Sequence, residues 1–165
     1  MRKHVLSVLV ENQSGVLSRI SGLFSRRGYN IHSLSVGETE DPTISRMTIV
    51  VEEDQQTLEQ IKKQLNKLID VIKIIELRSD TAVYRELALI KVRTDKDTRA
   101  EVIGVANIFR ARIIDVDIDC VMIEATGDQS KLTALINMLE PYGLKEVIRT
   151  GITALERGDT ELKSE

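Results

Sequence analysis

The fold is decided by residues 4–37, which read HVLSVLVENQSGVLSRISGLFSRRGYNIHSLSVG. Residues 5–10 are valine and leucine apart from Ser7, and such an apolar run rich in β-branched side chains predicts a buried strand. After the turn residues 12–15, apolar side chains recur at helical spacing from Val16 to Phe24, which predicts a helix with one apolar face. Gly28 predicts the end of that helix, and residues 29–36 predict a second strand.

The rest of the chain continues this order of elements. Residues 45–51 and 71–77 predict two more strands, and apolar residues spaced helically between 58 and 68 predict a helix between them. The second half repeats the order, with strands expected at 87–92, 113–118, 121–125 and 147–152 and helices at 98–109 and 132–139. We therefore predict an α+β protein made of two tandem ferredoxin-like βαββαβ modules, each with two helices on an antiparallel sheet.

The module boundaries follow from the polar stretch between the two halves. We expect a first module over residues 1–78, a linker over 79–85 and a second module over 86–165, with a charged tail that frays from Arg157. Helices on an antiparallel sheet cover only one of its faces. Strands as apolar as residues 5–10 need cover on both faces, so we expect the chain to form a homodimer through sheet edges or helices.

Composition narrows the function classes. The 165 residues carry a net charge of −3 and only 3% aromatic side chains. An acidic balance offers no footprint for nucleic acid or for an anionic membrane surface, and RNA-binding βαββαβ modules need aromatic side chains on their central strands. The single cysteine, Cys120, cannot form an internal disulfide, so we expect a cytoplasmic protein in which Cys120 is a small core residue.

No pattern in the sequence predicts catalysis. The two histidines, His4 and His32, have no companions at metal-ligand spacing, and the phosphate-binding and nucleophile motifs are missing. We predict no catalytic residue and no metal site on this chain. The alternation of Asp115, Asp117 and Asp119 favours a solvated sheet edge over a divalent-cation site.

The loop at residues 11–17 is the most informative stretch. A helix N-terminus exposes unpaired N–H groups that bind carboxylates, and Gly15 allows a ligand to approach the backbone closely. Asn12 can both donate and accept hydrogen bonds, while Val16 and Leu17 could line an apolar slot. These groups suit a free α-amino acid. The simpler interpretation, a capped helix after a tight turn, is favoured by the residues alone.

The same loop resembles the ligand loop of ACT domains, which are βαββαβ modules that sense small molecules. Residues 2–160 resemble the small regulatory subunit family of acetohydroxyacid synthase, also called acetolactate synthase. The resemblance is carried by residues 4–37, by DPTISRMTIVV (41–51) and EQIKKQLNKLIDVIKI (59–74), and by ELALIKV (86–92), FRARIIDV (109–116) and RTGITALERGD (149–159).

This resemblance implies a non-catalytic regulatory subunit in branched-chain amino-acid biosynthesis. The large subunit of such an enzyme performs the catalysis with thiamine diphosphate, Mg²⁺ and FAD. The small subunit activates it and confers feedback inhibition by valine, often also by leucine or isoleucine. The first ACT module would pair with its copy and hold valine at their interface.

The ligand residues that the resemblance implies come from two places in the module. The ligand loop would contribute Asn12, Gly15 and Val16, and the facing strand start would contribute Asn30 and Ile31, with Asn30 reaching the ligand from the neighbouring chain. Three alternatives stay open: a stand-alone ACT sensor for another enzyme or a transcription factor, a purely structural assembly module, and an enzyme in its own right.

Overall fold

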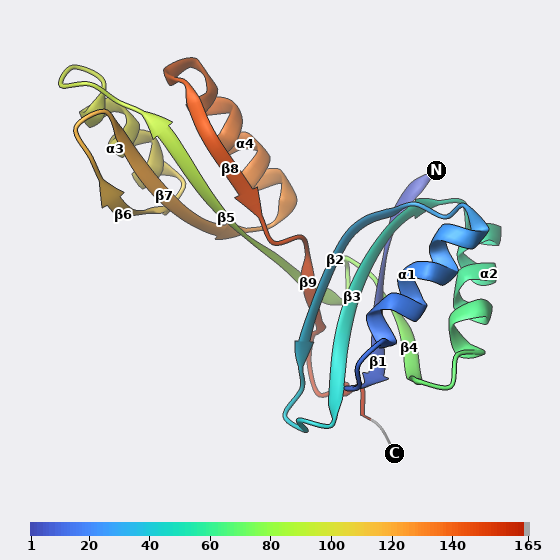
Figure 1. The fold of residues 1–165 in the computed structure, drawn as a ribbon. Coiled ribbons are helices and arrows are strands. Elements are labelled where there is room, and N and C mark those ends of the chain that lie inside the picture. Colours follow the sequence, from blue (N-terminus) through green and yellow to red (C-terminus); the bar gives the residue numbers. More distant parts are fainter. Residues whose placement is uncertain (164–165) are drawn as a thin grey trace. The chain divides into compact units, whose positions relative to one another are not determined.

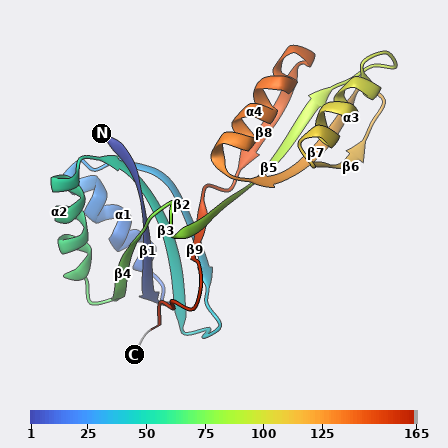
Figure 2. The ribbon, with the colours of Figure 1, turned by 180° about the vertical axis from the view of Figure 1, so that it is seen from behind.

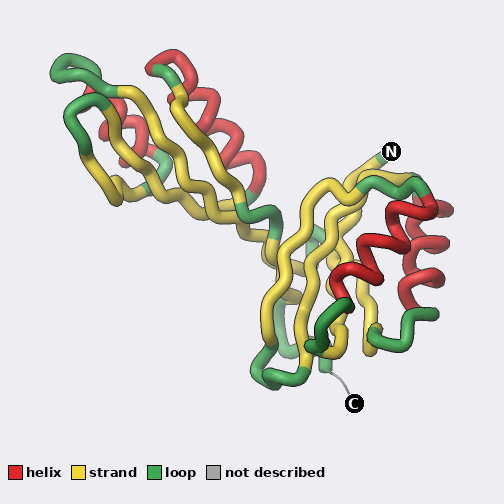
Figure 3. The backbone as a smooth tube through the Cα atoms, viewed as in Figure 1, coloured by secondary structure: helices red, strands yellow, loops and turns green. Residues whose placement is uncertain are grey.

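The computed structural model describes residues 1–163, and the chain forms two compact units. The first unit comprises residues 1–83 together with the segment from Ile152 onward, and the second comprises residues 84–151. In each unit a layer of strands packs against a layer of helices (Figures 1 and 3). The predicted α+β class with two βαββαβ modules is confirmed.

The sheet of the first unit is antiparallel and has the strand order β2-β3-β1-β4. Its central strands are β1 and β3, which pair along their whole lengths from Arg2 opposite Glu53 to Glu11 opposite Ile44. The elements of this unit are β1 (Arg2–Glu11), α1 (Val16–Arg27), β2 (Ile31–Glu38), β3 (Ile44–Glu53), α2 (Gln55–Asn66) and β4 (Val71–Leu77).

Local sequence signals set both helices of the first unit. Gly28 ends α1 in the left-handed conformation, with φ +70°, and its N–H donates to helix carbonyls. Asp54 begins α2, where its carboxylate accepts a hydrogen bond from the Thr57 N–H at 2.7 Å. The apolar faces of the two helices pack on one face of the sheet, and Leu6, Val8, Val10, Ile20, Phe24, Ile49, Leu58, Ile61 and Leu65 belong to the resulting core.

The chain itself covers the other face of this sheet. Val5, Ser7 and Leu9 point away from the helices and are nevertheless buried. The strand β9 (Thr153–Glu156) lies on that side of the sheet (Figures 1 and 2), and Ile152 just before it accepts a hydrogen bond from the Ser35 hydroxyl at 3.2 Å. Burial of this face therefore does not require a second chain. The expectation of a homodimer then rests on the family resemblance alone.

The second unit has the same arrangement. Its strands follow the order β6-β7-β5-β8 and are antiparallel. Ile90, Val102, Ile123, Leu132 and Leu135 are fully buried between this sheet and its two helices. The elements are β5 (Ala82–Arg93), α3 (Arg99–Ile108), β6 (Arg112–Val116), β7 (Cys120–Gly127), α4 (Gln129–Leu139), the short 3₁₀ helix η1 (Glu140–Tyr142) and β8 (Leu144–Arg149).

The structure differs from the sequence prediction at the boundaries. The expected linker over 79–85 is a short turn followed by β5, because alternation of side chains starts already at the buried Ala82. Residues from Ile152 onward, expected in the second module, group with the first. Arg157, where the tail was expected to fray, donates its N–H to the Thr81 carbonyl at 2.8 Å.

Candidate functional site

The loop between β1 and α1 is fixed by its own backbone and by two neighbouring loops. The Glu11 N–H donates to the Asp70 carbonyl at 2.9 Å, and the Asn12 N–H donates to the Thr43 carbonyl at 2.8 Å. Inside the loop, the Gln13 N–H donates to the Glu11 carbonyl at 3.0 Å. These hydrogen bonds tie the loop to Thr43 and to Asp70.

Gly15 stands at the start of α1 in the left-handed conformation, with φ +86°. This region favours glycine because other residues place Cβ too close to the backbone. No side chain caps the helix at Gly15, so the simpler interpretation of the loop as a side-chain cap does not hold. N–H groups of the first helical turn have no partner within the helix, and the positive end of the helix dipole lies there. Together they make a position suited to a carboxylate.

Arg19 adds a positive charge at the same position. A Cβ atom at Gly15 would lie 2.9 Å from Nη1 of Arg19, so the guanidinium lies beside the glycine. Its Nε donates to Oδ2 of Asp70 at 2.6 Å, and the Asp70 side chain is only 7% exposed. That hydrogen bond raises the pKa of Arg19 above its ordinary value, against the opposing effect of desolvation.

Sequence reasoning missed both partners of this ion pair. The position of Arg19, one helical turn after Gly15, was readable from the spacing of the helix. Asp70 gave no signal, because 51 residues separate the two in the chain. The pair fixes a cation at the helix N-terminus that would attract a carboxylate.

Asn12 ties the loop to the hairpin between β2 and β3. Its side-chain amide donates to the Pro42 carbonyl at 2.9 Å and to Oε1 of Glu38 at 3.2 Å. The residue is exposed, so its amide oxygen can still accept a hydrogen bond from an ammonium group. Asn12 therefore positions the hairpin and leaves an acceptor at the loop.

Val16 and Leu17 differ in what they can contact. The Val16 side chain is 3% exposed and belongs to the core under the helices. It anchors the helix and does not line a slot, so only its backbone can face a ligand. Leu17 is 47% exposed and is the apolar side chain beside the loop that a ligand or another chain could cover.

Asn30 and Ile31 lie at the opposite end of the sheet from the loop. Ile31 pairs with Val51, which pairs with His4, whereas the loop follows Glu11, which pairs with Ile44. Ile44 and Val51 are seven positions apart along the strand, a span of roughly 23 Å. One chain therefore does not bring the two groups of predicted ligand residues together.

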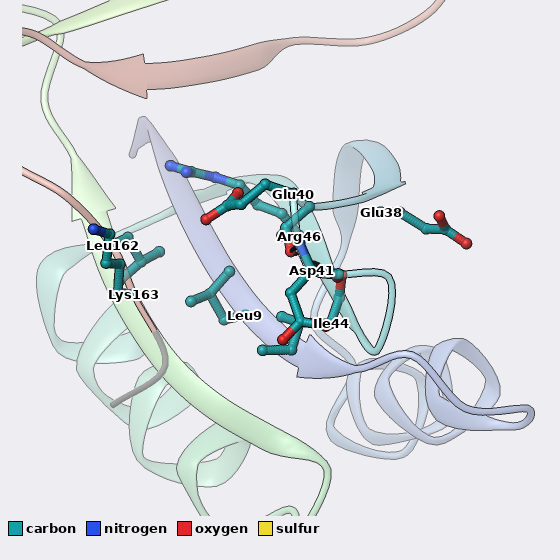
Figure 4. Close-up of a pocket in the computed structure, with 9 residues that line it drawn as sticks. Leu9, Glu38, Glu40, Asp41, Ile44, Arg46, Leu162 and Lys163 are labelled. Carbon is teal, nitrogen blue, oxygen red and sulfur yellow. Dashed lines mark hydrogen bonds between the residues drawn. The ribbon is translucent and has the colours of Figure 1, made fainter.

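A pocket of about 270 Å³ opens on the face of the first sheet that points away from the helices. Figure 4 shows the pocket between the β2–β3 hairpin, the β1 residue Leu9 and the C-terminal segment. Its lining combines aliphatic side chains with charged ones, and Arg46 of β3 is among them. This pocket could not be predicted from the sequence, because the residues that form it come from three distant segments.

Other predicted features have plain structural roles. Cys120 is half-buried at the start of β7. Asp117 and Asp119 do not continue a strand, since β6 ends at Val116 and the Asp117 N–H closes a turn to the Cys120 carbonyl at 2.8 Å. Within residues 1–163, no three His, Cys, Asp or Glu side chains gather at metal-binding distance. Within the same range, no helix is both long and apolar enough to cross a membrane.

Known protein families match both halves of the chain. Residues 6–73 match the family described as "AHAS small subunit-like ACT domain", and residues 85–158 match the family "Small subunit of acetolactate synthase". The acetolactate synthase small subunit of Mycolicibacterium smegmatis is 57% identical over 94% of this chain and 91% of its own length. A probable acetolactate synthase small subunit of Archaeoglobus fulgidus is 53% identical over 95% of this chain and 98% of its own length.

A solved structure agrees with these sequence matches. The crystal structure of an acetolactate synthase small subunit from Thermotoga maritima superimposes with a TM-score of 0.90 at 44% sequence identity. The alignment covers 97% of this chain and all of the other. The likeness therefore spans both units.

Proposed function

This chain belongs to the family of regulatory small subunits of acetolactate synthase, and we propose from this premise that it activates the catalytic large subunit and confers feedback inhibition by valine. The loop from Asn12 to Val16 supports the proposal most directly. It offers an uncapped helix N-terminus, the left-handed Gly15 and a fixed guanidinium, which together suit the carboxylate of a free amino acid. Catalysis, with thiamine diphosphate, Mg²⁺ and FAD, would take place on the large subunit.

The valine site is completed by a second copy of the chain in this proposal. Strand β2 is an edge strand of its sheet, and its eight residues run from Ile31 to Glu38. Antiparallel pairing of β2 with its copy would bring the Ile31 end of one strand to the Glu38 end of the other. Glu38 accepts a hydrogen bond from Asn12, so Asn30 of the second copy would arrive beside the ligand loop of the first.

Inhibition would follow from differential binding. A ligand shifts a conformational equilibrium only as far as its affinities for the two states differ. Valine held between two chains would fix their relative orientation, and a coupling of about 1–3 kcal/mol would shift the equilibrium between the two states by roughly 5–150-fold. The chain would transmit this change to the large subunit that it binds.

Reconstitution with the large subunit tests the proposal. Acetolactate formation is measured for the large subunit alone, with this chain added, and with valine added to the mixture. We expect this chain to raise the rate and valine to lower it again. If the rate is the same with and without this chain, the regulatory proposal is wrong; if activation occurs without valine sensitivity, the effector assignment is wrong.

A further inference from the structure

The pocket on the outer face of the first sheet lies outside the proposed valine site. Arg46 pairs with Leu9 in the register of β3 and β1, and Leu9 points away from the helices, so both side chains lie on the outer face. Leu9 and Ile44 provide apolar lining, and Leu162 of the C-terminal segment adds to it (Figure 4). The volume of about 270 Å³ lies just below the 300–1,000 Å³ that holds drug-sized ligands, which suits a smaller molecule.

Arg46 carries an unmet hydrogen-bond donor at this pocket. Its Nε is buried and has no hydrogen-bond partner among the described residues. A buried donor without a partner costs about 1–3 kcal/mol, and each such group calls for an explanation. Burial lowers the pKa of the Arg46 guanidinium, while the charges of Glu40 and Glu156 act in the opposite direction. Because Nε itself has almost no exposed surface, a ligand carboxylate in the pocket would meet the terminal nitrogens of the guanidinium and favour its charged form.

The carboxylates around the pocket are not equivalent. Glu38 accepts the amide of Asn12, and Asp41 accepts the Thr43 N–H at 2.9 Å and the Thr43 hydroxyl at 2.7 Å, which lowers the pKa of Asp41. Among the described residues, the Glu40 carboxylate has no hydrogen-bond partner. It lies beside Arg46 in Figure 4, and its charge acts on both Arg46 and Lys163. Glu40 is therefore the carboxylate able to receive a positively charged group.

We infer that this pocket is a second binding site for a free aliphatic α-amino acid, whose carboxylate meets Arg46, whose ammonium meets Glu40 and whose side chain lies on Leu9 and Ile44. The three kinds of group, a cation, an anion and an apolar surface, complement the three parts of such a ligand. The site goes beyond the proposed regulatory function and does not depend on it, because every residue involved lies outside the loop at Gly15.

The Arg46 side chain itself reports occupancy. In NMR spectra of the full chain, its Nε–Hε resonance is identified by its loss in an Arg46→Lys variant. L-valine is titrated into protein that carries Gly15→Asp, so that the proposed loop site does not contribute. We expect a saturable shift of this resonance. Isobutyrate and isobutylamine, each of which carries only one of the two charged groups, should bind at least about 10-fold more weakly.

Two variants that each remove one negative charge distinguish binding in the pocket from a general effect of net charge. Glu40→Gln should weaken valine binding about 10-fold or more and should not weaken isobutyrate binding, because only the ammonium meets Glu40 and the lost charge repelled the ligand carboxylate. Glu52→Gln, an exposed position on β3 at the end away from Arg46, should change the binding of neither valine nor isobutyrate. The inference is overturned if the Arg46 resonance does not shift saturably with valine, or if isobutyrate and isobutylamine both bind as tightly as valine. It is also overturned if Glu40→Gln leaves valine affinity unchanged. Loss of valine feedback by Gly15→Asp is a separate outcome and concerns only the loop.

Discussion

The substitution Gly15→Asp tests the proposed ligand loop most directly. Gly15 begins α1 beside Arg19, and a side chain added there would point at the guanidinium, with its Cβ 2.9 Å from Nη1. The new carboxylate would occupy the position proposed for the carboxylate of valine. It would also repel the valine carboxylate and neutralise the positive charge of Arg19 that attracts valine.

The magnitude follows from simple electrostatics. Two unit charges about 4 Å apart at an effective dielectric constant of about 20 repel each other by about 4 kcal/mol. Because each 1.4 kcal/mol is a factor of ten in affinity, valine should bind roughly 1,000-fold more weakly. The left-handed backbone, with φ +86°, costs a non-glycine residue about 1–2 kcal/mol. This is small beside a folding stability of about 5–15 kcal/mol, so the variant should stay folded.

The assay is acetolactate formation by the reconstituted enzyme over a range of valine concentrations. Gly15→Asp should keep activation and lose inhibition. Gly15→Ala introduces the same backbone strain and the same close Cβ contact with the flexible end of Arg19, without the charge, and should keep half-inhibition within about 10-fold of the wild type. Gly158→Asp introduces the same charge at φ +75° in open space and should behave as wild type. Full valine sensitivity in Gly15→Asp would refute the site, and equal losses in Gly15→Ala and Gly15→Asp would refute the electrostatic explanation.

Three further substitutions probe other parts of the chain. Asn30→Ala should raise the valine concentration for half-inhibition by roughly 2–150-fold, through loss of hydrogen bonds worth about 0.5–3 kcal/mol, with an unchanged melting temperature because Asn30 is exposed; unchanged half-inhibition would remove Asn30 from the site. Asp128→Ala removes the N-cap of α4 and should cost about 1 kcal/mol in urea unfolding at pH 7. Hydrogen bonds from the Lys131 N–H and the Ser130 hydroxyl hold the pKa of Asp128 below its ordinary value of 3.8. The stabilisation by the carboxylate is therefore fully present above that value and is lost as the pH falls below it, through the lowered pKa of the folded state. A cost of the substitution that stays equal at strongly acidic pH would contradict this reasoning. Ile152→Ala should destabilise the first unit by about 2–5 kcal/mol, because Ile152 is 7% exposed and groups with that unit. Hydrogen exchange should show faster opening of β1 and β3. An effect confined to β5–β8 would be evidence against assigning Ile152 to the first unit.

The sequence predicted best what local interactions decide. The helix α1 begins at Val16 and ends at Arg27 as expected, because its apolar spacing and the left-handed Gly28 are properties of adjacent residues. The repeated strand and helix order, and with it the fold class, follows from the same kind of pattern. Each signal acts within a few residues, so one sequence suffices to read it.

Contacts between distant segments could not be predicted from the sequence. The C-terminal segment returns to the first unit, and nothing local distinguishes β9 from a strand of the second module. The ion pair of Arg19 with Asp70 and the pocket at Arg46 likewise join segments that are far apart in the chain. A polar residue in a helix pattern predicts a solvated position, and only the fold reveals that it meets a buried carboxylate.

The separation of Asn30 from Gly15 carries a consequence for regulation. If residues at the two ends of the sheet contact one valine, each site must use two chains, and valine binds only the dimer. Linkage is reciprocal: the factor by which dimerisation raises valine affinity is the factor by which valine tightens the dimer. Sedimentation of the chain at rising dilution should therefore show dimers that persist to lower concentration when valine is present. Gly15→Asp should abolish this difference without weakening the unliganded dimer, because in the proposed arrangement Gly15 meets the ligand and β2 makes the contact between chains.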